Sequence, residues 1–418
     1  MALLTAPVPP GLTPRWKRVL AVSGPGLVVM LADTDAGSLI TAAQSGAQWG
    51  YRLLLLQAVL VPILFIVQEL TLRLGLVTGR GHGELIAERF GRGWAWLSVT
   101  TLALACIGAL VTQLSGLAGV AQLFGVPVWL AMLVTVTLIT GMVVTGSYRS
   151  VERIAILFGL CELVFLYVAW RAEPNLKEIA AQMVQAPLDD HRFLYLAAAN
   201  IGAVIMPWMV FYQQSAVLDK GLRPADLRLA RIDTAVGAVV TQAVMAAVLI
   251  AASATLGYGG GRGALDSVPQ IAAALTPFLG ADAGRLAFSL GMAGASVVAT
   301  IVVCLTAAWG LGEVVGFKRS LQHHPREAPV FYGVFSAILI AGALLVTSGV
   351  DLVALSVAVE VMNAGLLPIV LGFLFLLALR ALPEPYRLKG VYAWIVGAVV
   401  VVTAGFGLFA AVSGALGG

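Results

Sequence analysis

Eleven long apolar segments dominate this sequence, and they constrain its fold more than any other feature does. Their approximate positions are 18–45, 51–75, 94–122, 127–146, 151–170, 193–217, 234–257, 284–314, 329–348, 352–379 and 391–413. About 20 apolar residues are enough for a helix to cross a bilayer. A helix also satisfies its backbone polar groups within one segment, which an isolated strand in lipid cannot do. The sequence therefore predicts an all-α polytopic membrane protein.

The composition and the short connections exclude several classes of function. Only 11% of the residues are charged, against about 25% in soluble domains. No segment between the spans is long enough to fold alone, so we expect neither an enzyme domain nor a nucleic-acid partner. All three cysteines lie in apolar runs, which argues against a disulfide scaffold or a Cys-based metal cluster. No phosphate-binding loop with its lysine occurs, so we expect no nucleotide and no bound cofactor.

The basic residues predict the orientation of the chain. Nineteen of the 25 Lys and Arg residues fall in the short tail 1–17, in alternate connections, or at the span ends beside them. Cytoplasmic loops carry the excess of basic residues. We therefore expect a multi-pass protein of the cell membrane, with the N-terminus in the cytoplasm and the C-terminus outside. The first span is long enough to be a retained helix rather than a cleaved signal peptide.

Two spans contain breaks at matched positions. The first holds the polar run Asp33 to Ser38, and the sixth holds Gly202 to Pro207, in which Pro207 removes a backbone donor. An offset of five helices reverses the direction of the second break relative to the first. We therefore divide the chain into a repeat over 18–170, an inverted repeat over 193–380, and an eleventh helix over 391–413. Paired broken helices in inverted repeats are typical of a transporter site at the bilayer midplane, although single kinks are the simpler alternative.

Asp35 is the most informative residue of the first break. A carboxylate in mid-membrane costs about 2.5–3.5 kcal/mol on insertion scales, so it usually has a partner. The span cores contain no Lys or Arg, which favours a transported cation as that partner over a role in capping the broken backbone. Asp33 is either a second ligand, a cap of the first half-helix, or a residue that carries water. Ser38 and a carbonyl near Ala203 complete an oxygen-rich ligand set.

Met206 adds a thioether beside the second break. Soft sulfur ligands favour transition metals over magnesium, whereas most methionines in apolar helices only fill space. If Met206 does not bind the ion, a more hydrated Mg²⁺ becomes the expected substrate, because Mg²⁺ loses water reluctantly.

Further polar residues lie within the spans. Gln113, Gln213 and Asn363 either line a hydrated path or form hydrogen bonds between helices. Glu360 is a candidate coupling or gating acid, and for Glu162 we expect a bond that packs two helices.

Ion pairs and histidines complete the sequence-based predictions. Glu69 and Glu313 lie near Arg73 and Lys318, and we expect an ion pair in each case. The four histidines, at 82, 191, 323 and 324, all fall between spans, so no histidine is expected to relay protons within the membrane.

At these positions the sequence resembles the NRAMP divalent-metal transporters. Asp35-Ala36-Gly37-Ser38 is similar to the Asp-Pro-Gly-Asn break of that family, and Ala203 to Pro207 matches its Ala-x-x-Met-Pro motif. Three further segments agree with the family: Gln44 to Tyr51, Gln68 to Arg80, and Arg231 to Thr234. The resemblance implies the LeuT-type fold, with helices one and six interrupted, and a metal site made by Asp35, Ser38, Ala203 and Met206.

The sequence also departs from that family. Ser38 replaces the metal-binding asparagine, Gln113 stands where an acid for proton movement is usual, and Val357 replaces the helix-ten glutamine. Trp208, Met209 and Gln213 stand in place of the helix-six histidines and asparagine. Several segments instead resemble the related magnesium transporters: Trp208-Met209, Gln213-Gln214 and Asp219-Lys220-Gly221. Because of these departures, we expect Mn²⁺, Mg²⁺ or both as substrates. The departures also argue against the proton coupling that is usual in the family.

The leading hypothesis is a secondary transporter that moves divalent cations into the cytoplasm by alternating access around Asp35. A sodium-coupled symporter of a small organic solute on the same fold is the first alternative. A sensor that has lost transport is the second.

Overall fold

The computed structural model describes residues 22, 24–145, 147–256, 264–348 and 351–416, and helices account for nearly all of them. Ten helical runs are long and apolar enough to cross a membrane. One of them, Ala36–Thr78, has 43 residues, about twice what a crossing needs. It changes direction at a 3₁₀ turn, Gly50–Leu53, so it supplies two crossings. The described residues therefore contain the eleven spans that the sequence predicts.

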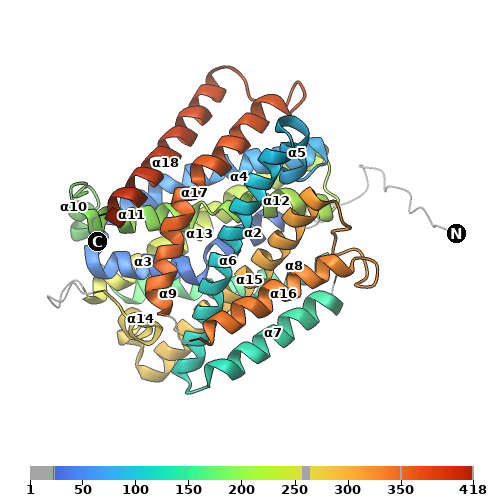
Figure 1. The fold of residues 1–418 in the computed structure, drawn as a ribbon. Coiled ribbons are helices and arrows are strands. Elements are labelled where there is room, and N and C mark those ends of the chain that lie inside the picture. Colours follow the sequence, from blue (N-terminus) through green and yellow to red (C-terminus); the bar gives the residue numbers. More distant parts are fainter. Residues whose placement is uncertain (1–21, 23, 146, 257–263, 349–350, 417–418) are drawn as a thin grey trace, which may run out of the picture.

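Figure 1 shows the helices, labelled from α2 onward. The spans are α2 (Pro25–Asp33) with α3 (Ala36–Trp49), α4 (Leu54–Thr78), α6 (Arg92–Leu123), α7 (Val128–Thr145), α8 (Tyr148–Gly159) with α9 (Val164–Arg171), α11 (His191–Val204) with α12 (Pro207–Asp219), α13 (Leu227–Leu256), α15 (Ala281–Val315), α16 (Pro329–Val346), α17 (Leu352–Arg380) and α18 (Gly390–Leu416). Short helices connect some of them: α5 (His82–Phe90), α10 (Leu176–Gln182) and α14 (Val268–Leu275).

Some helices extend beyond the predicted ends of the apolar spans. The seventh span begins at Leu227 rather than 234, because a charged stretch with Arg228 and Arg231 continues the helix beyond its apolar part. Hydropathy detects only the apolar part of such a helix. Predicted positions 18–21 and 23 of the first span lie outside the described residues.

The two broken spans lie side by side and run in opposite directions. The first half of span one, α2, packs against the second half of span six, α12, and α3 packs against α11. This pairing brings both breaks to the same depth of the bundle.

The remaining helices enclose this central pair. The long helix α13 packs against α2, α3 and α4, and α15 packs against α6, α12 and α16. Helix α17 contacts α3, α6, α11 and α18. In Figure 1, α18 and α7 lie at opposite edges of the bundle. Both carry exposed leucine or valine side chains, such as Leu138 and Val401, as expected for surfaces in contact with lipid.

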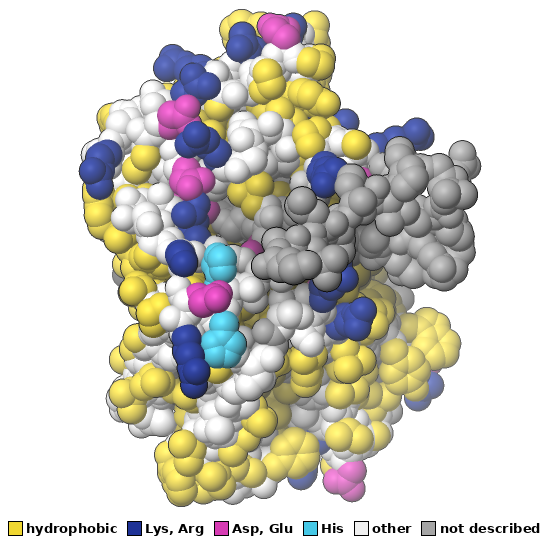
Figure 2. All heavy atoms as spheres, turned by 90° about the vertical axis from the view of Figure 1, so that its right-hand side faces the viewer, with side chains coloured by type: hydrophobic (Ala, Val, Ile, Leu, Met, Phe, Trp, Pro, Cys, Tyr) yellow, Lys and Arg dark blue, Asp and Glu magenta, His cyan; other side chains and the backbone are white. Residues whose placement is uncertain are grey.

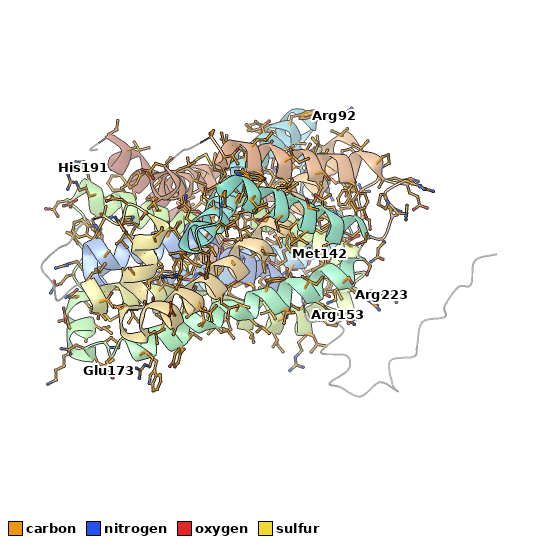
Figure 3. All side chains as sticks on the ribbon, turned by 90° about the horizontal axis from the view of Figure 1, so that it is seen from below. Arg92, Met142, Arg153, Glu173, His191 and Arg223 are labelled. Carbon is orange, nitrogen blue, oxygen red and sulfur yellow. The ribbon has the colours of Figure 1, made fainter. Side chains whose placement is uncertain are left out.

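Charge separates the two ends of the bundle. Figure 3 shows Glu173 and His191 at one end and Arg153 and Arg223 at the other. Figure 2 looks onto this second end, where Lys and Arg side chains gather with several acids between them. We call it the basic end, and the other the far end. The separation agrees with the alternation of basic loops in the sequence.

Candidate functional site

The first break is short, and its own residues satisfy part of the broken backbone. Helix α2 ends at Asp33 and α3 begins at Ala36. Asp35 has an extended backbone (φ −82°, ψ 178°) and caps α3, since its Oδ1 accepts the Ser38 amide N–H at 2.7 Å. Asp35 is fully buried. Asp35 therefore does cap the broken backbone, which the sequence had left as an alternative. The cap uses the Oδ1 atom of the carboxylate.

The second break also has an extended residue before its second half-helix, but with different chemistry. Helix α11 ends at Val204, and α12 begins at Pro207, which needs no hydrogen-bond acceptor at the first helical position. Met206 precedes α12 as Asp35 precedes α3, with nearly the same φ of −83°. Its side chain caps nothing. The two breaks thus place a carboxylate and a thioether at equivalent positions.

One hydrogen bond joins the two breaks directly. The Ser38 hydroxyl donates to the carbonyl oxygen of Ala203 at 3.0 Å. Both residues are buried. The bond identifies the Ala203 carbonyl as an oxygen that faces the first break.

Gln113 on α6 supports the first break from the side. Its Nε2 donates to Asp35 Oδ2 at 2.5 Å, and its Oε1 accepts the Ala36 amide N–H at 2.9 Å. Both oxygens of Asp35 therefore accept hydrogen bonds from the protein. An ionised carboxylate has about four lone-pair sites, so each oxygen keeps capacity for a further positive partner.

A second carboxyl group reaches the same place from α17. A Cβ atom on Gly37 would lie 2.3 Å from Glu360 Oε1 and 3.4 Å from Asp35 Oδ1. Glu360 Oε1 has no hydrogen-bond partner among the described residues, whereas Oε2 accepts from Asn363 Nδ2 at 2.9 Å. Gly37 therefore makes room for Glu360 beside Asp35, since any side chain at residue 37 would displace that carboxyl.

The α17 backbone also lies against the second break. A Cβ atom on Gly202 would lie 1.8 Å from the Glu360 carbonyl oxygen. Glu360 thus contacts Gly37 with its side chain and Gly202 with its backbone. Small residues in both broken helices allow this close approach.

Two more buried acids lie near Asp35. Both oxygens of Asp33 and both of Glu162 lack hydrogen-bond partners in the described part of the chain. Asp33 interacts electrostatically with Asp35 and Glu360, and the Glu162 carboxyl lies beside Thr34. The helix-packing bond expected for Glu162 stays a prediction, with the Thr34 hydroxyl as its candidate donor. Among the described residues, Asp33 does not cap α2.

The remaining predicted residues lie close by with other partners. Met206 is fully buried, and its sulfur accepts the indole N–H of Trp208 at 3.0 Å. Gln213 donates to Thr234 of α13 at 2.9 Å, which directs its amide toward α13. The structure therefore brings together Asp35, Ser38, Ala203, Gln113 and Glu360, with Asn363 behind Glu360. The sequence pointed to Gly202 and Trp208, but not to the contact of Gly202 with Glu360 or of Trp208 with Met206.

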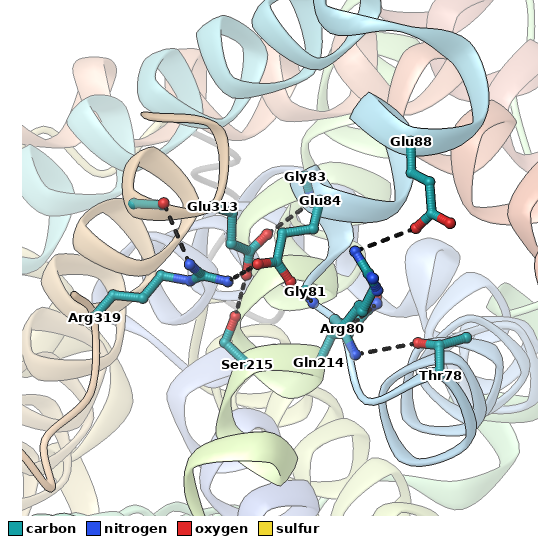
Figure 4. Close-up of polar contacts among 11 residues, drawn as sticks. Thr78, Arg80, Gly81, Gly83, Glu84, Glu88, Gln214, Ser215, Glu313 and Arg319 are labelled. Carbon is teal, nitrogen blue, oxygen red and sulfur yellow. Dashed lines mark hydrogen bonds and ion pairs between the residues drawn. The ribbon is translucent and has the colours of Figure 1, made fainter. Parts of the chain in front are cut away.

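A separate polar network closes the basic end. Figure 4 shows Glu313 of α15, which accepts the Gly83 amide N–H and the Ser215 hydroxyl, both at 2.7 Å, while Arg319 pairs with Glu84. The predicted pair of Glu313 with Lys318 is therefore wrong, since α5 and α12 supply the partners. The other predicted pair is confirmed, because Glu69 binds Arg73 at 2.6 Å.

His82, expected in a loop, is instead buried in α5. Its Nδ1 lies 3.3 Å from Gln214 Oε1, and its ring packs on Phe211 at a centroid distance of 4.8 Å. Burial lowers the pKa of His82 to about 4. The imidazole is therefore neutral near pH 7 and belongs to the contact between α5 and α12.

Asp233 of α13 holds the first half-helix at the basic end. Its Oδ2 accepts the amide N–H groups of Gly24, Gly26 and Leu27 at 2.9–3.1 Å. A carboxylate at a helix N-terminus satisfies free donors and complements the helix dipole. Helix α2 is thereby fixed against α13.

A cavity of about 570 Å³ opens at the far end. Gln44, His191, Asp266, Asp351 and Val357 are among its lining residues. Val357 lies one turn before Glu360 on α17, so this wall of the cavity is one helical turn from the Glu360 position. A smaller cavity, of about 290 Å³, lies beside Glu313 at the basic end.

Comparisons with known proteins agree with this architecture. A family model described as natural resistance-associated macrophage protein-like (Nramp) matches residues 26–413. The divalent metal cation transporter MntH of Xanthomonas campestris is 29% identical over 323 residues, covering 73% of this chain and 70% of that protein.

Solved structures show the same fold. A manganese transporter of Eremococcus coleocola, in complex with an aromatic bis-isothiourea compound, superposes with a TM-score of 0.76 at 20% identity, covering 98% of this chain and 90% of that one. Mhp1, a nucleobase-cation-symport-1 family transporter, superposes with a TM-score of 0.54 at 15% identity over 93% and 90% of the two chains. The predicted LeuT-type inverted repeat is confirmed.

Proposed function

Because the chain belongs to the Nramp family, we propose that it is a secondary transporter that carries divalent metal cations through the membrane by alternating access. The ion would bind between the two breaks, held by Asp35, Glu360, Ser38 and the Ala203 carbonyl. The Asp35–Glu360 pair is the observation that carries this proposal. Two buried carboxyls meet there without a Lys or Arg partner among the described residues, and a divalent cation balances them.

The donor set suits Mn²⁺ and Mg²⁺. Carboxylate, hydroxyl and carbonyl oxygens are the preferred ligands of small hard cations. Relatives are named for divalent metal cations or manganese, which supports Mn²⁺ as a substrate. Asp33, which interacts electrostatically with Asp35 and Glu360, would add a third carboxyl group near the ion.

Entry would begin at the far end. The far-end cavity approaches the site along α17, while Asp233 fixes α2 and the Glu313 network joins α5 to α12 at the basic end. Release toward the basic end requires these contacts to open. With that end in the cytoplasm, an inside-negative potential favours entry by about 4.6 kcal/mol per divalent ion per 100 mV.

We further propose that transport does not use the usual proton route of the family. Gln113 is a neutral amide that both donates to and accepts from the first break. It cannot accept a proton near pH 7. His82, the buried histidine, lies in α5 at the basic end rather than at the breaks.

Proteoliposomes that enclose a Mn²⁺-sensitive dye and a pH dye test the proposal. The wild-type protein should admit Mn²⁺ without acidifying the lumen, and Asp35→Asn should not admit it. Asp282→Asn, which changes an exposed acid on α15, is the matched control and should transport normally. Wild-type vesicles that pass neither Mn²⁺ nor Mg²⁺ would overturn the proposal, and sodium-dependent uptake of an organic solute would favour the symporter instead.

A further inference from the structure

The sulfur of Met206 is engaged by its neighbour Trp208. The indole Nε1–H donates to Met206 Sδ at 3.0 Å, and both side chains are fully buried. Met206 is the residue just before α12 and Trp208 the second residue of that helix. Their contact crosses the turn where the chain enters the helix, so it belongs to the break itself.

The indole N–H of Trp208 has no alternative acceptor to replace the Met206 sulfur among the recorded contacts of the described residues. An indole can only donate, and in the described part of the chain its one recorded acceptor is the Met206 sulfur. Turning the thioether toward an ion would leave a buried N–H without a partner, which is unfavourable. Trp208 therefore holds Met206 in its present orientation.

The oxygens of the site have no such restraint. Glu360 Oε1 has no hydrogen-bond partner in the described residues, and the hydrogen bonds that Asp35 accepts leave lone pairs free, since a carboxylate has about four. The Ala203 carbonyl accepts only from the Ser38 hydroxyl among the contacts of the two breaks. An ion between the breaks would therefore meet oxygens with free lone pairs, and a thioether sulfur that is held by the Trp208 indole N–H.

We propose that Trp208 is a specificity-determining residue, which withholds the Met206 thioether and leaves an oxygen-only site that favours hard divalent cations over soft ones. The proposal rests on the proposed function, since it concerns the same site. Mg²⁺ and Mn²⁺ are the expected substrates, and Cd²⁺, a soft cation, is the expected poor ligand.

The test measures the ratio of Cd²⁺ to Mg²⁺ affinity by calorimetry on the purified protein in detergent. Trp208→Phe keeps an aromatic ring and removes the N–H, so the freed sulfur should raise this ratio about tenfold, an increment worth 1.4 kcal/mol. Met206→Leu in the wild-type background should leave the ratio unchanged, because the sulfur is not used. The double variant W208F/M206L should lose the gain of W208F.

Two outcomes would overturn the proposal. A fall of the ratio in M206L alone means that Met206 already binds the ion, and an equal rise in W208F and W208F/M206L means that the sulfur is not responsible. Met209→Leu, a second buried methionine of α12, controls for repacking in this helix and should change nothing. If the wild-type protein binds no divalent cation at all, the proposed function fails rather than this inference. If W208F does not fold, M206L can still overturn the proposal, because a fall of its ratio would show that Met206 already binds the ion.

Discussion

Ser38 in the first broken helix donates a hydrogen bond of 3.0 Å to the carbonyl of Ala203 in the second. This bond joins the inverted repeats at the point where both helices are interrupted. It orients a carbonyl oxygen toward the acids of the first break. Ser38 thereby fixes the position of the first broken helix relative to the second at the site.

Ser38→Ala should weaken metal binding without abolishing it. The variant loses one neutral hydrogen bond and one oxygen donor, a change of about 1 kcal/mol, so Mn²⁺ affinity should fall about fivefold. Ser115→Ala is the matched control, because the Ser115 hydroxyl is buried but bonds within its own helix, to Val111. Calorimetry compares the two, and an equal loss in both would count against the link.

Gly37→Ala should damage the site by displacing Glu360. The added methyl group would lie 2.3 Å from Glu360 Oε1, so that carboxyl must move away from Asp35. We expect Mn²⁺ affinity to fall more than about tenfold, the effect of losing one charged ligand. Gly365→Ala on α17, where nothing lies within 4 Å, should bind like the wild type.

Both variants replace a helical glycine, so each gains similar helix propensity. The comparison therefore isolates the contact with Glu360. Wild-type affinity in Gly37→Ala would show that Glu360 does not bind the ion.

His82 should make the folded protein less stable in mild acid. Its folded pKa is about 4, below the ordinary value of 6.5, so the unfolded chain binds a proton that the folded chain does not. The stability is complete above about pH 6.5 and falls by about 1.4 kcal/mol per pH unit down to about pH 4. Thermal unfolding in detergent at pH 7.5 and pH 5 measures the difference.

His82→Gln removes the titrating group while keeping a polar side chain. Its unfolding temperature should fall less between pH 7.5 and pH 5 than that of the wild type. His324→Gln, at an exposed position, should behave like the wild type. The same fall in all three proteins would contradict the assigned role of His82.

Local patterns in the sequence predicted much of the fold. The apolar runs fixed the number of spans, and the basic loops predicted the charge at each end. The polar run at Asp35 and the proline at Pro207 located both breaks, because each disrupts a helix through its own chemistry. Each of these features depends only on residues that are close together in the sequence, so one sequence is enough to predict it.

Contacts between distant segments could not be predicted in this way. Glu360 was visible as a buried acid, but its position over Gly37 depends on how α17 crosses α3. Glu313 was paired with Lys318 because that residue is near in sequence, whereas its partners come from α5 and α12. The orientation of the Met206 sulfur depends on the turn between Met206 and Trp208, which departs from helical geometry.

The most direct test of the central claim is the anomalous scattering of Mn²⁺ in crystals of the metal-loaded protein. We expect one strong peak within about 2.0–2.6 Å of a carboxylate oxygen of Asp35 and of Glu360 Oε1, the range of oxygen ligation for such ions. A peak bound to Asp35 but remote from Glu360, or a peak outside the two breaks, would contradict it.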